Sequence, residues 1–327
     1  MCRFTTYREV MDVKRRFLCL LVVLSFSVQT ASAKVLKWVD FSVPYESLKY
    51  AMDMDIKTST QEKHISWIDI LTLAGCRTGG KCGLQSVRKA AKDLEGNRSV
   101  EELAGEYYAY YHTAYSAVLG GLLGNFAIEK DGCWVPCYGL KAYSPIAAGY
   151  GYSLCSDFGN SRSFGFARKH LGNDLMGGLG TPIVAVEGGV VEAMGWNRYG
   201  GWRIGIRSFD SKRYYYYAHL QKDRPFASGL KEGDTVQAGD LIGFMGRTGY
   251  SDRENVNNIE TVHLHFGMQL VFEESQKECN SEIWINVYDI VRLLSGHRST
   301  VSKDETGYHR TYGYEDLDVL EYCPKEA

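Results

Sequence analysis

Short apolar runs separated by glycine-rich turns dominate the chain from about residue 140 onward, and this pattern restricts the fold more than any other feature. Apolar runs of this length, bounded by turn residues, are typical of β-strands. Candidate strands lie in the runs TPIVAV, GVVEAM, WRIGIRS, YYYYAHL, DTVQAG, LIGFMG and VHLHFGMQLVF. The pattern predicts a mainly antiparallel β domain over residues 140–298. The segment 282–296, EIWINVYDIVRLLSG, has apolar residues at helical spacing and predicts a C-terminal helix that closes this domain.

The preceding region, residues 34–139, has the periodicity of amphipathic helices. Its segments are ESLKYAMDMDIKT, SWIDILTLAG, QSVRKAAKDLEGN and SVEELAGEYYAYYHTAYSAVLGGLLGNF. In the last of these, Ser99 is followed three residues later by Glu102, the spacing of a capping box. We therefore predict an α+β chain with a helical accessory region at 34–139. Residues 299–327 are polar and are expected to form a tail or a packed appendage.

The N-terminus has the order of a secretory signal. The basic residues 14–16 precede an apolar run at 17–28, and QTASA supplies a cleavage site after Ala33. The apolar run is short for a membrane-spanning helix, which needs about 20 residues. We expect residues 1–33 to be a signal peptide, with a retained anchor that tethers the chain to a membrane as the alternative. Either interpretation predicts an extracytoplasmic protein, secreted or held at a membrane.

Charge and cysteine content limit the partners and the redox chemistry. Lys plus Arg is 37 and Asp plus Glu is 39, so the net charge of −2 argues against nucleic-acid binding. Of nine cysteines, Cys2 and Cys19 belong to the leader, which leaves an odd number, seven. The close pairs Cys76/Cys82 and Cys133/Cys137 lack the repeat of a structural zinc site, so disulfides or free thiols are expected.

The run VHLHFG, residues 262–267, places two histidines on one face of a predicted strand. Side chains alternate along a strand, so His263 and His265 point the same way. Leu264 and Phe266 then point to the opposite side, as a plausible core face. Two imidazoles on one surface are suited to hold a metal ligand and a catalytic group a few ångströms apart.

A second segment, RKHLGNDL, lies about ninety residues upstream and contains His170 and Asp174. Imidazole and carboxylate are both zinc ligands, and one histidine of the HLH pair would complete three, which leaves a position for water. The other histidine and His219, of YYYYAHL, would lie beside the metal. Zinc lowers the pKa of water to about 7 and polarises carbonyl groups, while non-ligand histidines transfer protons. The predicted reaction is metal-assisted amide hydrolysis.

These elements occur in the order RKHLGNDL, GTPIVAVEGGVVE, YYAHL, LKEGDTVQAGDLIGFMG and HLHF, and together they resemble the lysostaphin-type, LytM-like family of zinc peptidoglycan endopeptidases. The resemblance covers roughly residues 145–275. By position, it implies that His170, Asp174 and His265 bind one Zn²⁺ per chain and that His219 and His263 form the catalytic pair. It also implies an antiparallel β fold with a loop-lined groove, and peptidoglycan peptides as substrates.

The chain departs from the family pattern at two places. Residues 251–261, SDRENVNNIET, are inserted before HLHF and are expected to border the groove and alter substrate preference. Gly267 stands where an acidic residue is common in the family. Two further side chains have open roles: Arg168 either orients a substrate carboxylate or pairs with a surface acid, and Tyr217 either approaches the site or packs in the core.

The predicted function is that of an exported zinc endopeptidase, which cuts peptide bonds of the stem peptide or the cross-bridge in peptidoglycan. The alternative is a non-catalytic LytM-like scaffold or regulator of wall remodelling, in division or sporulation, that binds rather than cuts. The helical region at 34–139 is expected to have a regulatory or docking role, including occlusion of the groove. The sequence leaves the cleaved bond and the oligomeric state open.

Overall fold

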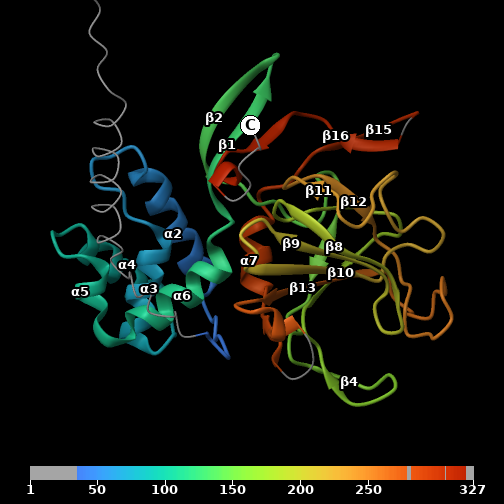
Figure 1. Ribbon diagram of the computed structural model, residues 1–327, viewed down its shortest axis with the longest axis horizontal. Helices are drawn as coiled ribbons and strands as arrows, with labels where there is room; N and C mark the ends of the chain where they lie inside the picture. Colours follow the sequence, from blue (N-terminus) through green and yellow to red (C-terminus); the bar gives the residue numbers. More distant parts are fainter. Residues whose placement is uncertain (1–34, 278–280, 306, 322–327) are drawn as a thin grey trace, which may run out of the picture. The chain divides into compact units, whose positions relative to one another are not determined.

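The computed structural model describes residues 35–277, 281–305 and 307–321 (Figure 1). The predicted leader, Cys279 and Cys323 lie outside these ranges. Within them, no helix has the length and apolar character needed to cross a bilayer. The cysteines of the two close pairs, Cys76/Cys82 and Cys133/Cys137, are free thiols, as is Cys155.

Helices form the N-terminal part of the described chain, as the periodicity predicted. They are α2 (Tyr45–Thr58), α3 (Trp67–Thr78), α4 (Leu84–Leu94), α5 (Val100–Ala104) and α6 (Tyr108–Leu119), with a 3-10 turn at Gly105–Tyr107. The predicted capping box is confirmed: the Ser99 hydroxyl accepts from the Glu102 N–H at 3.2 Å, and the Glu102 carboxylate accepts from the Ser99 N–H at 3.0 Å.

The helical prediction is wrong for residues 123–140. They form an antiparallel hairpin of β1 (Leu123–Lys130) and β2 (Cys133–Leu140). Asp131 and Gly132 both have positive φ, at 52° and 76°, which is the backbone of a tight two-residue turn. Strand β17 (Tyr314–Asp316), from the C-terminal segment, pairs with β1. Pairing with a strand nearly two hundred residues away outweighs the local helical pattern, because strand formation depends on neighbouring strands.

An antiparallel sheet of eight strands forms the main body of the β domain, as predicted. Seven follow the order β11-β8-β9-β10-β13-β6-β3, and β14 pairs with β13. Their bounds are β3 (Tyr152–Leu154), β6 (Asn173–Gly177), β8 (Gly189–Asn197), β9 (Gly201–Ser208), β10 (Arg213–Ala218), β11 (Thr235–Val236), β13 (His263–Leu270) and β14 (Ile283–Ile285).

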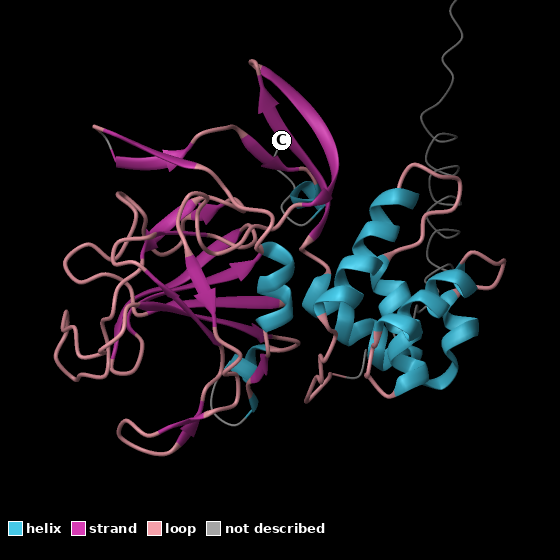
Figure 2. Cartoon of the chain, turned by 180° about the vertical axis from the view of Figure 1, so that it is seen from behind, coloured by secondary structure: helices cyan, strands magenta, loops and turns pink. Residues whose placement is uncertain are grey.

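Three two-stranded ladders complete the strands. They are β4 (Ser161–Arg162) with β5 (Arg168–Lys169), β7 (Pro182–Val184) with β12 (Leu241–Phe244), and β15 (Val301–Asp304) with β16 (Gly307–Arg310). Figure 2 shows that helices α2 to α6 gather together, apart from the strands. The chain is thus an α+β protein with helices before a mainly antiparallel β domain.

The prediction of a C-terminal helix at 282–296 is wrong for the first half of this segment. Residues Ile283–Ile285 are strand β14, and helix α7 covers only Tyr288–Leu294. The β-branched residues of β14 pair with Met268–Leu270 of β13, the part of that strand that β6 leaves unpaired, and the isolated segment carries no sign of this partner. Further on, β15 to β17 show that the C-terminal segment is a packed appendage, the second of the two predicted alternatives.

Candidate metal centre and groove

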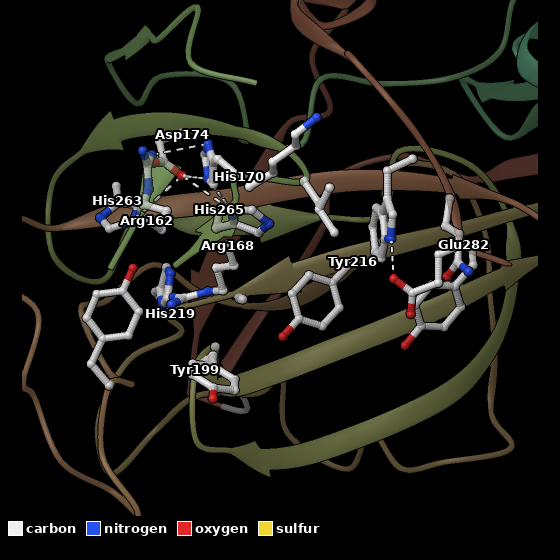
Figure 3. Close-up of a pocket in the computed structure, with 18 of the residues that line it drawn as sticks. Arg162, Arg168, His170, Asp174, Tyr199, Tyr216, His219, His263, His265 and Glu282 are labelled. Atoms are coloured by element: carbon white, nitrogen blue, oxygen red, sulfur yellow. Dashed lines mark hydrogen bonds and ion pairs between the residues drawn. The ribbon is translucent and has the colours of Figure 1, made fainter. Parts of the chain in front are cut away.

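Strand register brings the predicted metal ligands together. On the adjacent strands β6 and β13, Asp174 lies directly opposite His265, and Met176 lies opposite His263. His170 comes from the short segment between β5 and β6, where its N–H donates to the Asn160 carbonyl at 2.8 Å. Residues separated by about ninety positions therefore meet at one end of the sheet (Figure 3).

The three potential ligand atoms lie at the spacing expected around a tetrahedral metal ion. His170 Nε2 is 2.7 Å from His265 Nδ1 and 3.0 Å from Asp174 Oδ1, and His265 Nδ1 is 3.3 Å from Asp174 Oδ1. Metal–ligand bonds of 2.0–2.2 Å at tetrahedral angles separate ligand atoms by about 3.3 Å. The three side chains therefore have the geometry of a three-ligand site.

The polar atoms of this cluster also fit a cation. Asp174 Oδ1 is buried and faces the ligand nitrogens of His170 and His265 at 3.0 and 3.3 Å, although neither contact has the geometry of a good hydrogen bond. Burial alone would raise the pKa of Asp174, but these contacts with His170 and His265 outweigh burial and lower the pKa, so the carboxylate is ionised. Two imidazoles and one carboxylate are a donor set that Zn²⁺ accepts, so these residues fit zinc.

Asp157 and Arg162 hold two of the ligands in place, and the sequence analysis did not identify either. His170 Nδ1–H donates to the Asp157 carbonyl at 3.1 Å. Arg162 donates to Asp157 Oδ2 at 2.8 Å and to Asp174 Oδ2 at 3.1 Å, which leaves Oδ1 of Asp174 facing the two imidazoles. Such partners orient metal ligands, but no motif marks them, because their role depends on the folded chain.

His219 and His263 lie beside the three candidate ligands, and their ring centroids are 4.7 Å apart. Their Nδ1 atoms lie 2.9 Å from the carbonyl oxygens of Thr248 and Thr261. A carbonyl oxygen can only accept, so each Nδ1 carries a proton and donates it to that carbonyl. Burial, together with the charges of His263 and His265, lowers the pKa of His219 well below its usual value, which keeps this ring neutral at pH 7.

The backbone of His219 is held in an unusual conformation. Its φ is 62°, in the left-handed region, and its N–H donates to the Gly200 carbonyl at 2.7 Å. Thr248 fixes the ring from the other side and is itself buried, with its hydroxyl donating to the Leu220 carbonyl at 2.6 Å. Strained residues fixed by their surroundings are frequent at functional sites. Thr248 is a further site residue that no sequence motif identified.

A groove of about 390 Å³ extends from the candidate metal centre along the face of the sheet. Tyr214 and Tyr216 of β10 line it, whereas Tyr215 and Tyr217 are fully buried on the other face. The Tyr217 hydroxyl accepts from the Val186 N–H at 2.9 Å. Of the two roles left open for Tyr217, the structure therefore supports core packing. The tyrosines that line the groove are instead Tyr214 and Tyr216.

Arg168, Tyr199 and Tyr250 line the groove near the two catalytic candidates. The Arg168 guanidinium lies 4.6 Å from the centre of the Tyr199 ring and 5.3 Å from that of Tyr250, and it donates to the Phe164 carbonyl at 2.8 Å. Within the described ranges, Arg168 forms no ion pair with a carboxylate. Its charge therefore faces the groove, as the first of its two predicted roles requires.

The inserted loop begins at the rim of the groove. Tyr250, directly before it, lines the groove, but none of residues 251–261 does. Asn255 anchors the loop: its side-chain oxygen accepts from Trp202 Nε1 at 2.9 Å, and its amide donates to Asp223 at 2.7 Å. The insertion thus positions the rim of the groove without entering it.

Comparison with known proteins agrees with this geometry. The sequence model of Peptidase family M23 matches residues 168–279 of this chain. An L-Ala--D-Glu endopeptidase of Bacillus subtilis (strain 168) is 43% identical over 124 residues, which are 38% of this chain and 36% of that protein. Glycyl-glycine endopeptidase ALE-1 of Staphylococcus capitis is 33% identical over 145 residues, 43% of this chain and 34% of that protein. The chain spans about a third of the length of these relatives, and the match to the M23 family covers residues 168–279, about a third of the chain.

A likeness in fold extends beyond the M23 region. The crystal structure of a lytM protein from Ruminococcus gnavus ATCC 29149 matches with a TM-score of 0.51 and 24% sequence identity. It covers 78% of this chain and 89% of that one, so the shared fold reaches residues outside 168–279.

Proposed function

We propose that the chain is a zinc-dependent endopeptidase that hydrolyses peptide bonds in bacterial peptidoglycan. His170, Asp174 and His265 would hold one Zn²⁺. The convergence of these three side chains, with their candidate ligand atoms about 3 Å apart, is the observation that carries the proposal. The names of the relatives, both endopeptidases, support the reaction class.

Bound zinc would supply a Lewis acid that activates water and polarises the scissile carbonyl group. His219 and His263 supply the proton transfers. His219, a neutral imidazole with its proton on Nδ1, accepts a proton at Nε2 from the water as the water oxygen bonds to the carbonyl carbon, and His263 stands beside it as the second proton-transfer group. The same groups return a proton to the amide nitrogen as the carbon–nitrogen bond breaks, so the products are a carboxylic acid and an amine.

The groove supplies the binding surface for the peptide. Its floor consists of the side chains of β10 and β13 that point away from the core, which include Tyr216 and Gln269. A strand rises about 3.3 Å per residue, so an extended peptide of several residues fits along this floor. We also propose that the chain acts outside the cytoplasm, where peptidoglycan lies; this rests on the signal sequence predicted at residues 1–33.

The proposal is tested with purified protein of residues 34–327. Cell walls incubated with this protein are expected to release peptide fragments with new amino termini, detected by mass spectrometry, and zinc chelation is expected to stop the release. The His265→Ala variant should lose both zinc and activity. The His309→Ala variant is the matched control, because His309 is an exposed histidine far along the chain on β16.

The same experiment separates cutting from binding. A protein that binds zinc and cell walls, yet releases no peptide, would support the scaffold alternative and contradict the hydrolase proposal. Full activity in the His265→Ala variant would contradict the assignment of the metal ligands. The presence of all three ligands together with both catalytic candidates supports an active enzyme over a scaffold.

A further inference from the structure

The end of the groove farthest from the candidate metal centre is built in part by strand β14, which follows the M23 region (Figure 3). In the pairing of β13 with β14, Trp284 lies opposite Gln269. On β13 the residues that share the groove face are His265, Gly267 and Gln269, since side chains alternate. Trp284 thus stands beside the floor of the groove, four residues beyond the ligand His265.

Gly267 leaves the space that the Trp284 indole occupies. A Cβ atom at position 267 would lie 2.8 Å from Cζ3 of Trp284 and 2.9 Å from the Leu171 carbonyl oxygen, closer than such contacts occur. The indole also meets the Tyr216 ring edge to face, with centroids 6.2 Å apart. The missing side chain at 267 therefore lets an aromatic wall rest directly on the groove floor.

A carboxylate is fixed to this wall. The Trp284 indole N–H donates to Glu282 Oε2 at 2.8 Å, and both residues line the groove. Within the described ranges, no lysine or arginine forms an ion pair with Glu282. The neighbouring Lys277, by contrast, pairs with Glu192 and Glu274.

The other acid that lines this end of the groove is already neutralised. Glu192 pairs with Arg207 at 2.7 Å as well as with Lys277. Among the described charged residues at this end of the groove, Glu282 is therefore the one without an ion-pair partner. A carboxylate that lines a groove together with Trp and Tyr rings is suited to bind an organic cation, which the carboxylate attracts and the aromatic rings can contact.

We propose that Glu282 and Trp284 form a subsite for a positively charged amine of the peptide substrate and thereby set the specificity of the enzyme. This inference rests on the proposed function, because it names a charged group of the same substrate. Gln269, opposite Trp284, is four residues beyond His265, about 13 Å along the strand. The amine therefore belongs to a residue about three to four positions from the bond that is cut.

Peptides that differ in one amine test the subsite. We would use a set of synthetic stem-type peptides in which a single lysine, either free or acetylated at its side-chain amine, stands at successive positions. The ratio of kcat/KM for free over acetylated peptide is expected to reach on the order of ten at one position, the size of a cation–π contact combined with an ion pair. In the Glu282→Gln variant the ratio of kcat/KM for free over acetylated peptide should fall to about one.

Glu273→Gln is the matched control. It makes the same change of charge a few residues away, at an exposed side chain that does not line the groove, and it should keep the preference. Binding is measured separately, as the dissociation constants of the same peptides, labelled with a fluorophore, for a His219→Ala protein with and without Glu282→Gln. Binding should show the same amine preference and the same loss.

The outcomes separate this inference from the proposed function. If no peptide is cut but the Glu282-dependent preference appears in binding, the hydrolase proposal fails and the subsite stands. If free and acetylated peptides are cut and bound equally at every position, or if Glu282→Gln keeps the preference, the subsite is refuted and the hydrolase proposal is unaffected.

Discussion

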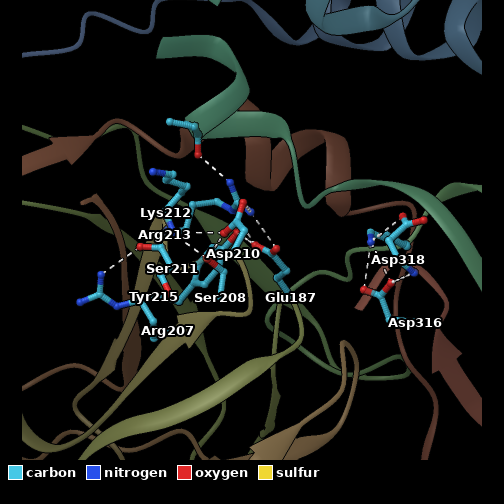
Figure 4. Close-up of polar contacts among 12 residues, drawn as sticks. Glu187, Arg207, Ser208, Asp210, Ser211, Lys212, Arg213, Tyr215, Asp316 and Asp318 are labelled. Atoms are coloured by element: carbon cyan, nitrogen blue, oxygen red, sulfur yellow. Dashed lines mark hydrogen bonds and ion pairs between the residues drawn. The ribbon is translucent and has the colours of Figure 1, made fainter. Parts of the chain in front are cut away.

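Replacing Arg213 by methionine removes a buried cation that connects the helices to the sheet (Figure 4). The side chain is 1% exposed, on β10, the strand that leads to His219. Its guanidinium donates to Glu187 at 2.7 and 3.0 Å, to Asp210 at 2.7 Å and to the Ala117 carbonyl of α6 at 2.7 Å. Methionine retains much of the volume but none of these bonds.

The cost follows from the charges that are left behind. Removal of one partner from a buried ion pair costs about 3–5 kcal/mol, because the other partner stays buried and uncompensated. Glu187, which is 9% exposed, would be the buried partner left without a compensating charge. We expect Arg213→Met to lower the free energy of unfolding by about 4 kcal/mol and the melting temperature by on the order of 10 °C. The double variant Arg213→Met/Glu187→Gln should recover part of the loss.

The pH dependence follows from Asp210. Burial raises its pKa, but Arg213, with Ser208 and the Lys212 N–H, outweighs burial and lowers the pKa. The lowered pKa adds stability that is fully present above the unfolded value, near 4, and is lost as the pH falls through the folded value. The difference between wild type and Arg213→Met should therefore be greatest at neutral pH and shrink below about pH 4.

Urea denaturation followed by circular dichroism, at pH 7 and at pH 3.5, measures this difference. Arg292→Met is the matched control: Arg292 is 45% exposed and pairs with Asp289 at the surface, so its loss should cost under about 1 kcal/mol. A loss at pH 7 no larger than that of the control, or a difference that grows at acid pH, would refute the reasoning.

Three further predictions follow from the contacts described above. Gly267→Ala should lower the free energy of unfolding by about 1–3 kcal/mol through its clash with Trp284, and an unchanged thermal melt would contradict this. Asp157→Ala should raise the dissociation constant for zinc about 10- to 100-fold, measured by competition with a chelating dye, because it frees Arg162 from its anchor; equal affinity would argue against that role. A fragment of residues 140–327 should show no cooperative unfolding transition, since it lacks α6 and β1, and a sharp transition in circular dichroism would disprove the requirement.

The contacts of the helical region argue against its predicted role in occlusion. None of the described residues before Arg162 lines the groove. Helix α2 instead meets α7, where the Tyr45 N–H donates to Asp289 at 3.1 Å, and the end of α6 accepts from Arg213. The helices are thus part of the support of the β domain. Any docking or regulatory role of residues 34–139 remains a prediction for their outer surface.

Features that depend on short-range chemistry could be predicted from the sequence. The capping box at Ser99 involves two residues three positions apart, so it could be predicted without knowledge of the fold. Alternation along a strand placed His263 and His265 on one face before their partners were known. The family resemblance then indicated which histidine and which carboxylate belong together, and the register of β6 with β13 agrees.

Features that depend on distant segments were decided only by the tertiary structure. Residues 123–140 form strands because β17 pairs with β1, and β14 forms because β6 leaves the last residues of β13 unpaired. Thr248 acquires its role at His219, and Trp284 its place over Gly267, through contacts that no spacing in the sequence expresses. The physical reason is that local preferences differ by a fraction of a kcal/mol per residue, whereas strand pairing and burial, which outweigh them, exist only once the chain has folded.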